Sequence, residues 1–123
     1  MFDVIIVGGG VIGCAVLDEL QRYDTKCLLL EKNDDVSCGA SRANSGIVHA
    51  GYDCKPNTLK AELNVKGCKL MQSLVKELHV PYVNTGSLVV TTASGKKGIE
   101  GLYEKGVKNG VDVEIIGRDR ILE

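Results

Sequence analysis

Residues 4–20 read VIIVGGGVIGCAVLDEL, and this stretch decides the fold class of the chain. The β-branched run at residues 3–7 does not alternate between apolar and polar positions, as expected of a parallel strand buried on both faces. Three glycines follow, and a helix-like pattern then runs from residue 11 to about residue 23. A second buried strand is predicted over residues 26–31, which contain CLLL. This order of strand, glycine turn, helix and strand predicts a right-handed βαβ unit.

The three glycines of the GxGxxG pattern have separate tasks. Gly8 permits the tight turn, Gly10 lets the backbone approach a pyrophosphate, and Gly13 lets the helix pack closely on the strand. The N-terminus of the helix then offers N–H groups and a partial positive charge to phosphates. The pattern therefore predicts a dinucleotide site, although Leu17 stands where a small residue is common.

A carboxylate completes the pattern. Glu31 follows Gly13 by 18 residues and ends the second predicted strand. There it can accept hydrogen bonds from the adenosine ribose, and its charge would repel a 2′-phosphate. Lys32 is its neighbour, and a lysine at such a position is usually solvated.

The segment after the second predicted strand indicates whether the cofactor is FAD or NAD. A nicotinamide-binding half would continue with another crossover helix and a third parallel strand. Residues 33–51 instead lose all apolar periodicity and include NDDVSCGASRANSG, a composition typical of a loop. Small side chains and exposed amides suit an extended cofactor, which favours FAD. A nicotinamide-dependent dehydrogenase stays open as an alternative.

The rest of the chain predicts helices and a few short strands. A long amphipathic helix is expected from Asn57 or Thr58 to about His79, which caps its last carbonyls before Pro81. Its apolar face carries Leu59, Leu63, Gly67, Leu70, Leu74 and Leu78. Residues 82–83 and 88–90 predict a short antiparallel pair around a glycine turn.

Further helices and a strand are expected near the end of the chain. A helix capped by Ser94 and stopped by Gly110 comes first, followed by a strand at residues 113–115. Asp119 is expected to cap a last helix.

Composition limits the possible partners. The chain has 123 residues, of which 44% are hydrophobic and 25% charged, the make-up of one globular domain. Its net charge of −1 argues against nucleic acid or an anionic membrane as the main partner. No apolar stretch approaches the roughly 18 residues of a membrane span, so a cytoplasmic protein with a small-molecule partner is expected. The five cysteines form no CxxC pair, which favours reduced thiols and no metal site.

Four stretches together make the chain recognisable: VIIVGGGVIGC, LLLEK, SRANSGIVHAG and GSLVVTT. They resemble the FAD-dependent oxidoreductases of the D-amino-acid-oxidase superfamily, in particular the branch of glycerol-3-phosphate and L-2-hydroxyglutarate dehydrogenases. The resemblance implies an α/β, Rossmann-like FAD-binding domain over residues 1–123. Members of the family are several times longer, so the chain is expected to be the N-terminal part of a larger enzyme.

The resemblance also implies roles for individual residues. The pyrophosphate of FAD is expected at Gly8, Gly10, Val11, Ile12 and Gly13. Glu31 and Lys32 are expected at the adenosine ribose, and Ser41, Asn44, Ser45 and Gly46 along the phosphate, ribityl and flavin part. His49 is implied to lie near the flavin ring as the base.

The chemistry supports a base of this kind. Oxidation of a secondary alcohol needs a hydride acceptor, which is flavin N5, and a base that takes the hydroxyl proton, for which imidazole is well suited. The alternative for His49 is a loop histidine bonded to backbone. We expect glycerol 3-phosphate as substrate, with L-2-hydroxyglutarate or another 2-hydroxy acid, or a non-catalytic nucleotide-binding module, as alternatives. The isolated chain is expected to be inactive and to associate through uncovered apolar faces, which the remainder of the enzyme would otherwise cover.

Overall fold

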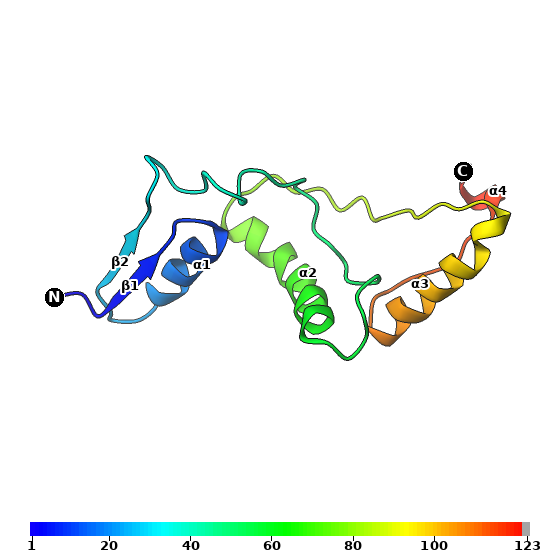
Figure 1. Ribbon diagram of the computed structural model, residues 1–123, viewed down its shortest axis with the longest axis horizontal. Coiled ribbons are helices and arrows are strands. Elements are labelled where there is room, and N and C mark those ends of the chain that lie inside the picture. Colours follow the sequence, from blue (N-terminus) through cyan, green and yellow to red (C-terminus); the bar gives the residue numbers. More distant parts are fainter. Residues whose placement is uncertain (122–123) are drawn as a thin grey trace. The chain divides into compact units, whose positions relative to one another are not determined.

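The computed structural model describes residues 1–121 (Figure 1). The chain divides into two compact units, Met1–Ile47 and Val48–Glu123. Each unit contains its own helices. The glycine turn and Glu31 belong to the first unit, and His49 belongs to the second.

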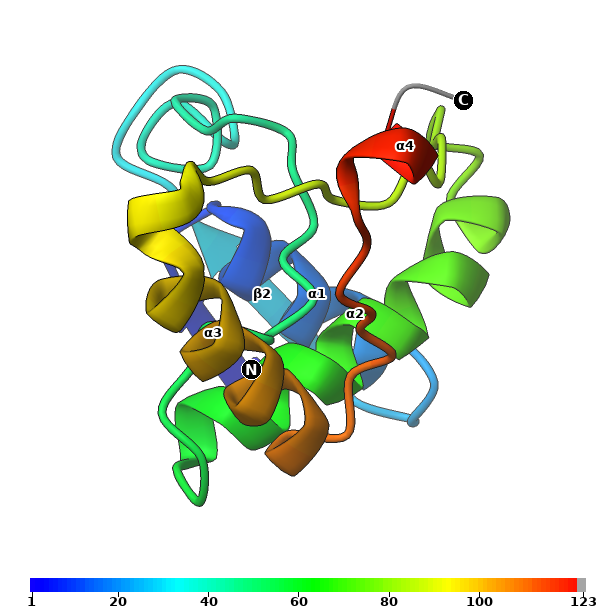
Figure 2. The same ribbon diagram turned by 90° about the vertical axis from the view of Figure 1, so that its right-hand side faces the viewer.

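The first unit is the predicted βαβ unit. Strand β1 spans Val4–Val7, helix α1 spans Val11–Leu20 and strand β2 spans Cys27–Leu30. The two strands pair in parallel, with Val4 opposite Cys27 and Val7 opposite Leu30. Helix α1 contacts both strands and lies against their sheet (Figure 2). The sequence pattern around the glycines is therefore confirmed as strand, turn, helix and strand.

The second unit begins with a long helix, α2, at Leu59–Glu77. The Thr58 hydroxyl accepts a 3.3 Å hydrogen bond from the Ala61 N–H, so Thr58 and not Asn57 is the N-cap. At the other end, His79 adopts a φ of 55° and its Nδ1 lies 2.9 Å from the Lys76 carbonyl oxygen. The predicted capping role of His79 is confirmed.

Helix α3 spans Lys96–Lys108 and follows a 3-10 turn, η1, at Ala93–Gly95. The predicted N-cap Ser94 is wrong, because Gly95 takes that position and its neighbour Ser94 pairs through its hydroxyl with Thr92 Oγ1 at 2.9 Å. The predicted stop at Gly110 is confirmed, since this residue has a φ of 73°. A short helix α4, Arg118–Ile121, begins one residue before its predicted cap, Asp119.

The short antiparallel pair predicted at residues 82–83 and 88–90 is wrong. In the described part of the chain the only sheet is β1–β2, and residues 80–92 follow an extended course without strand pairing. Gly86 does adopt the φ of 72° that a turn needs. An isolated hairpin is only marginally stable, because it needs a third strand or a packed apolar face, and Val83 and Leu88 are 79% and 58% exposed. The strand predicted at residues 113–115 is absent from the described residues as well.

Little of the apolar surface is buried. Among the described residues the buried apolar side chains are those of Cys54, Ala61 and Val75. The predicted leucine face of α2 is exposed, with Leu59 at 68% and Leu78 at 52%. In the described part of the chain, no helix combines the length and the apolar character that crossing a membrane requires.

Candidate functional site

The turn between β1 and α1 is as tight as the glycine pattern predicts. Gly8 has a φ of 105°, a conformation that residues with a side chain rarely adopt. A Cβ on Gly13 would lie 1.9 Å from the Gly8 carbonyl oxygen. The first turn of α1 therefore passes so close to the end of β1 that only glycine fits at position 13.

Gly9, which the GxGxxG reading leaves without a task, is the buried glycine of the turn. A Cβ at this position would lie 2.9 Å from Val36 Cγ1 and 3.3 Å from Leu29 Cδ2. The Gly9 carbonyl accepts a 2.8 Å hydrogen bond from the Ser37 N–H. Gly9 thus joins the turn to the loop after β2, and the sequence signal for it was the uninterrupted GGG run.

Glu31 lies directly after β2 and is held by three donors. Its Oε1 accepts from the Asn33 backbone N–H at 2.9 Å and from Asn33 Nδ2 at 2.8 Å, and its Oε2 accepts from the Gly9 N–H at 2.7 Å. The Asn33 backbone, followed by that of Gly9, holds the pKa of the Glu31 carboxyl below its ordinary value. A carboxylate has about four acceptor positions, so Oε2 keeps room for one more donor, such as a sugar hydroxyl.

Ser41 meets the N-terminus of α1. Its hydroxyl accepts a 2.8 Å hydrogen bond from the Val11 N–H, and a Cβ on Gly10 would lie 3.2 Å from the same oxygen. The absent side chain of Gly10 therefore lets the loop after β2 approach the helix. Among the described residues, the N–H groups of Ile12 and Gly13 have no protein acceptor, as is usual in the first turn of a helix.

The remaining predicted cofactor residues of the loop shape it or stay exposed. Asn44 donates from Nδ2 to the Ser41 carbonyl and accepts at Oδ1 from the Gly46 N–H at 2.7 Å. Gly46 has a φ of 66°, which completes this local turn. Ser45 and Lys32 are exposed.

His49 belongs to the second unit, whereas the glycine turn belongs to the first. Its ring is exposed. Its role as the base, and the alternative of a loop histidine bonded to backbone, both stay predictions. Within residues 1–121 no group of histidine, cysteine and carboxylate side chains could hold a metal ion.

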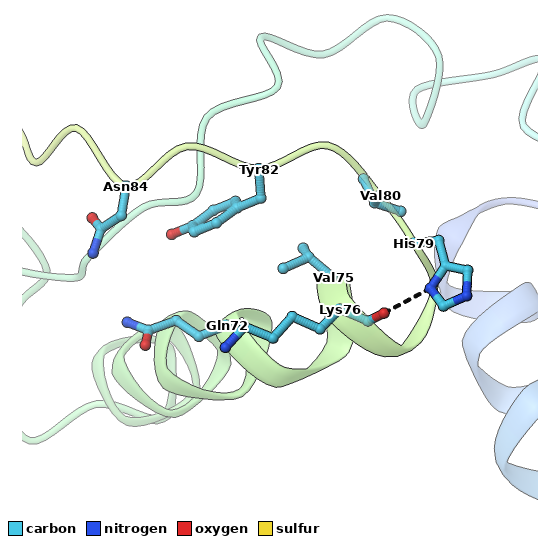
Figure 3. Close-up of a pocket in the computed structure, with 7 residues that line it drawn as sticks. All are labelled: Gln72, Val75, Lys76, His79, Val80, Tyr82 and Asn84. Carbon is cyan, nitrogen blue, oxygen red and sulfur yellow. Dashed lines mark hydrogen bonds between the residues drawn. The ribbon is translucent and has the colours of Figure 1, made fainter.

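A cavity of about 450 Å³ lies in the second unit, between the end of α2 and the extended segment that follows (Figure 3). Buried Val75 and the ring of Tyr82 face it from opposite sides. The cavity is lined by Gln72, Val75, Lys76, His79, Val80, Tyr82 and Asn84. None of the residues predicted to bind a cofactor lines it.

The first unit fits a dinucleotide. The turn consists of glycines, two N–H groups at the helix N-terminus are free, and hydrogen bonds hold the Glu31 carboxylate near the end of β2 and lower its pKa. These are the donor and acceptor types that a pyrophosphate and a ribose require.

Comparison with known proteins identifies the class. Residues 3–123 match the DAO family of FAD-dependent oxidoreductases, and the chain belongs to this family. The resemblance found in the sequence is thereby confirmed, as is FAD over a nicotinamide cofactor.

Several dehydrogenases and oxidases of known name are similar to the chain over most of its length. The chain is 46% identical over 125 residues to the glycerol 3-phosphate dehydrogenase of Caloramator mitchellensis, covering 100% of this chain and 26% of that protein. It is 42% identical to the glycerol 3-phosphate oxidase of Mycoplasma genitalium, covering 93% and 30%. It is 40% identical to the mitochondrial L-2-hydroxyglutarate dehydrogenase of Dictyostelium discoideum, covering 90% and 26%. The chain thus spans less than a third of the length of these relatives.

A solved structure agrees with the fold. The dithionite-reduced L-α-glycerophosphate oxidase from Mycoplasma pneumoniae, with FAD bound, matches with a TM-score of 0.76 and 33% identity. The match covers 91% of this chain and 30% of that one. The predicted Rossmann-like α/β class is therefore confirmed.

Proposed function

We propose that this chain forms the dinucleotide-binding part of an FAD-dependent enzyme that oxidises glycerol 3-phosphate. The choice of substrate is carried by one observation, the 46% identity to a glycerol 3-phosphate dehydrogenase over the whole chain. The geometry of the first unit supports the binding of FAD. The glycine turn and the helix N-terminus suit a pyrophosphate, and the Glu31 carboxylate suits a ribose.

The pyrophosphate is assigned to the turn and the start of α1. The residues that would hold it are Gly8, Gly10, Val11, Ile12 and Gly13. The free N–H groups of Ile12 and Gly13 would donate to phosphate oxygens, and the helix dipole favours the negative charge. Ser41 accepts from the Val11 N–H, which leaves its own hydroxyl proton available for a phosphate oxygen.

The rest of the cofactor is assigned to the segment after β2. Glu31 would accept a hydrogen bond from the adenosine ribose through the open position on Oε2, with Lys32 beside it. Asn44, Ser45 and Gly46 would line the ribityl and flavin part. Because both ends of the Asn44 side chain are already bonded within the loop, we assign Asn44 the task of shaping the loop.

His49 is assigned the role of base. Bound FAD supplies the hydride acceptor. A ring nitrogen of His49 would take the proton of the secondary hydroxyl as the C–H bond is broken. The side chain of His49 is exposed and therefore accessible to a substrate.

L-2-Hydroxyglutarate is the second candidate substrate, favoured by the 40% identity to an L-2-hydroxyglutarate dehydrogenase. Both candidates carry a secondary alcohol and at least one anionic group. The same base and hydride acceptor would oxidise either substrate. The residues that bind the anionic group of the substrate would therefore determine the specificity.

The test uses the whole protein that contains these residues. Purified protein is expected to show flavin absorbance and, without oxygen, to bleach on adding glycerol 3-phosphate far faster than on adding L-2-hydroxyglutarate. The reverse order would make the second candidate the substrate. Bound flavin that neither compound reduces would indicate a non-catalytic nucleotide-binding module. Peroxide formation in air, compared with reduction of an artificial acceptor, would distinguish an oxidase from a dehydrogenase.

A further inference from the structure

The backbone directly after His49 packs closely against α2. Two residues beyond His49, Gly51 opens a turn that closes when the Cys54 N–H donates to the Gly51 carbonyl at 3.3 Å. Gly51 is buried and has a φ of 91°. A Cβ on Gly51 would lie 3.0 Å from Val65 Cγ2 and 3.3 Å from Asn64 Cβ. The turn at residues 51–54 therefore has little freedom on the side that faces α2.

One side chain from the far end of the chain holds both ends of this turn. Asn109 Nδ2 donates to the Gly51 carbonyl and to the Cys54 carbonyl, at 2.9 Å each. The hydrogen bonds are partly buried, and Cys54 is only 6% exposed. Figure 1 shows the C-terminal end of α3 (orange) beside this turn. Without the Asn109 amide, the Cys54 carbonyl would lose this donor in a partly buried place, and the Gly51 carbonyl would keep only the bond from the Cys54 N–H.

Asn109 is itself fixed by the end of α3. The Gly110 N–H donates to the Val107 carbonyl at 3.0 Å and the Val111 N–H to the Gly106 carbonyl at 2.9 Å, which is the Schellman arrangement of a helix end. A Cβ on Gly106 would lie 2.9 Å from Val113 Cγ1 and 3.3 Å from Tyr52 Cβ. A side chain at position 106 would therefore collide with Val113 and crowd Tyr52 of the turn, so the missing side chain of Gly106 lets the helix end lie close to both.

We propose that Asn109 is a positioning residue for His49, which rests on the proposed role of His49 as the base. The His49 side chain is exposed, so the position of its ring depends on the backbone that carries it. On the C-terminal side that backbone is anchored, within two residues, by the Asn109 amide. Displacing a catalytic group by about 1 Å can cost roughly 100-fold in rate, so the anchor controls catalysis without touching substrate.

The test compares Asn109→Ala with Lys108→Ala in the whole FAD-loaded enzyme. Lys108 is exposed and lies one position earlier at the same helix end, which makes it a matched control. For Asn109→Ala we expect normal flavin content and faster hydrogen exchange in peptides covering residues 48–58 but not 4–20. The limiting rate of flavin reduction should fall by about 10- to 100-fold. Lys108→Ala should change neither exchange nor rate.

A double-mutant cycle separates positioning from a merely structural effect. If Asn109 acts through His49, adding Asn109→Ala to His49→Ala causes no further slowing. Multiplying effects in the double variant, or unchanged exchange and rate in Asn109→Ala, would overturn the positioning role alone. A wild-type rate in His49→Ala would show that His49 is not the base, and Asn109 would then have no catalytic group to position. If Asn109→Ala does not fold, Asn109→Gln, which keeps an amide but displaces it by one methylene, takes its place in the cycle.

Discussion

The N–H of Gly9 donates a 2.7 Å hydrogen bond to Oε2 of Glu31, although the two residues lie 22 positions apart. This bond ties the glycine turn after β1 to the end of β2, so the turn proposed to hold the phosphates and the carboxylate proposed to hold the ribose are positioned as one piece. The Cβ that Gly9 lacks would lie 3.3 Å from the same oxygen, and the two residues could not approach so closely otherwise.

Replacing Glu31 by Gln should weaken FAD binding. The amide keeps the shape of the side chain but offers only one acceptor oxygen, which cannot serve Asn33, Gly9 and a ribose hydroxyl together. We expect the dissociation constant to rise by roughly tenfold or more, the scale of a hydrogen bond to a charged group. Titration of flavin fluorescence measures it. An unchanged constant would show that the ribose is held elsewhere.

The same carboxylate makes stability depend on pH. Bonds from Asn33 and Gly9 lower the pKa of folded Glu31 below its ordinary value of 4.5. The stabilisation is therefore complete above about pH 4.5 and is lost as the pH falls through the folded pKa. The difference in melting temperature between wild type and Glu31→Gln should shrink as the pH drops below 4.5. A difference that does not vary with pH would contradict this assignment.

Gly13→Ala should disrupt the first unit, whereas Gly67→Ala should not. The new methyl at position 13 would meet the Gly8 carbonyl oxygen at 1.9 Å, while nothing lies within 4 Å of a Cβ at position 67 in α2. Alanine in an exposed helix interior is favoured over glycine by about 0.5–1 kcal/mol. Denaturant unfolding should show strong destabilisation or insoluble protein for Gly13→Ala, together with lost FAD, and a small gain for Gly67→Ala. Full FAD content in Gly13→Ala would refute the close approach.

His49→Ala should leave FAD bound and slow reduction of the flavin by substrate. General-base catalysis contributes about 10²–10⁴-fold, and His49 is exposed, so its replacement should leave the protein folded. Anaerobic stopped-flow measures the bleaching rate directly. His79→Ala is the matched control, because that ring caps α2 through the Lys76 carbonyl and should affect stability only. Wild-type bleaching in His49→Ala would return His49 to a structural loop residue.

The chain of 123 residues, prepared alone, should associate with itself and bind FAD weakly. Leu63 and Leu70 on α2 are 54% and 56% exposed, and Val7 of β1 is 85% exposed, so apolar surface is available for contact. A shallow, open turn retains a dinucleotide poorly without an enclosing pocket. Light scattering and a flavin spectrum test both expectations. A monodisperse monomer carrying one tightly bound FAD would contradict them.

The amino-acid sequence by itself determined the βαβ unit, the class of cofactor and the ends of two helices. These depend on local signals: the apolar run before Gly8, the absence of side chains in the turn, a polar capping residue at position 57 or 58, and Gly110 after the last turn of a helix. Each signal acts within a few residues, so it can be seen in a short window of sequence.

Only the tertiary structure decided which distant residues support the site. Gly9 and Glu31 meet because parallel pairing brings the ends of β1 and β2 together, and Asn109 meets Gly51 because the end of α3 approaches the turn at residues 51–54. Among the described residues, the predicted strand pair around Gly86 is absent because no other element packs against it. A hairpin is stable when other elements cover it, and local sequence shows the turn but not whether a partner is present.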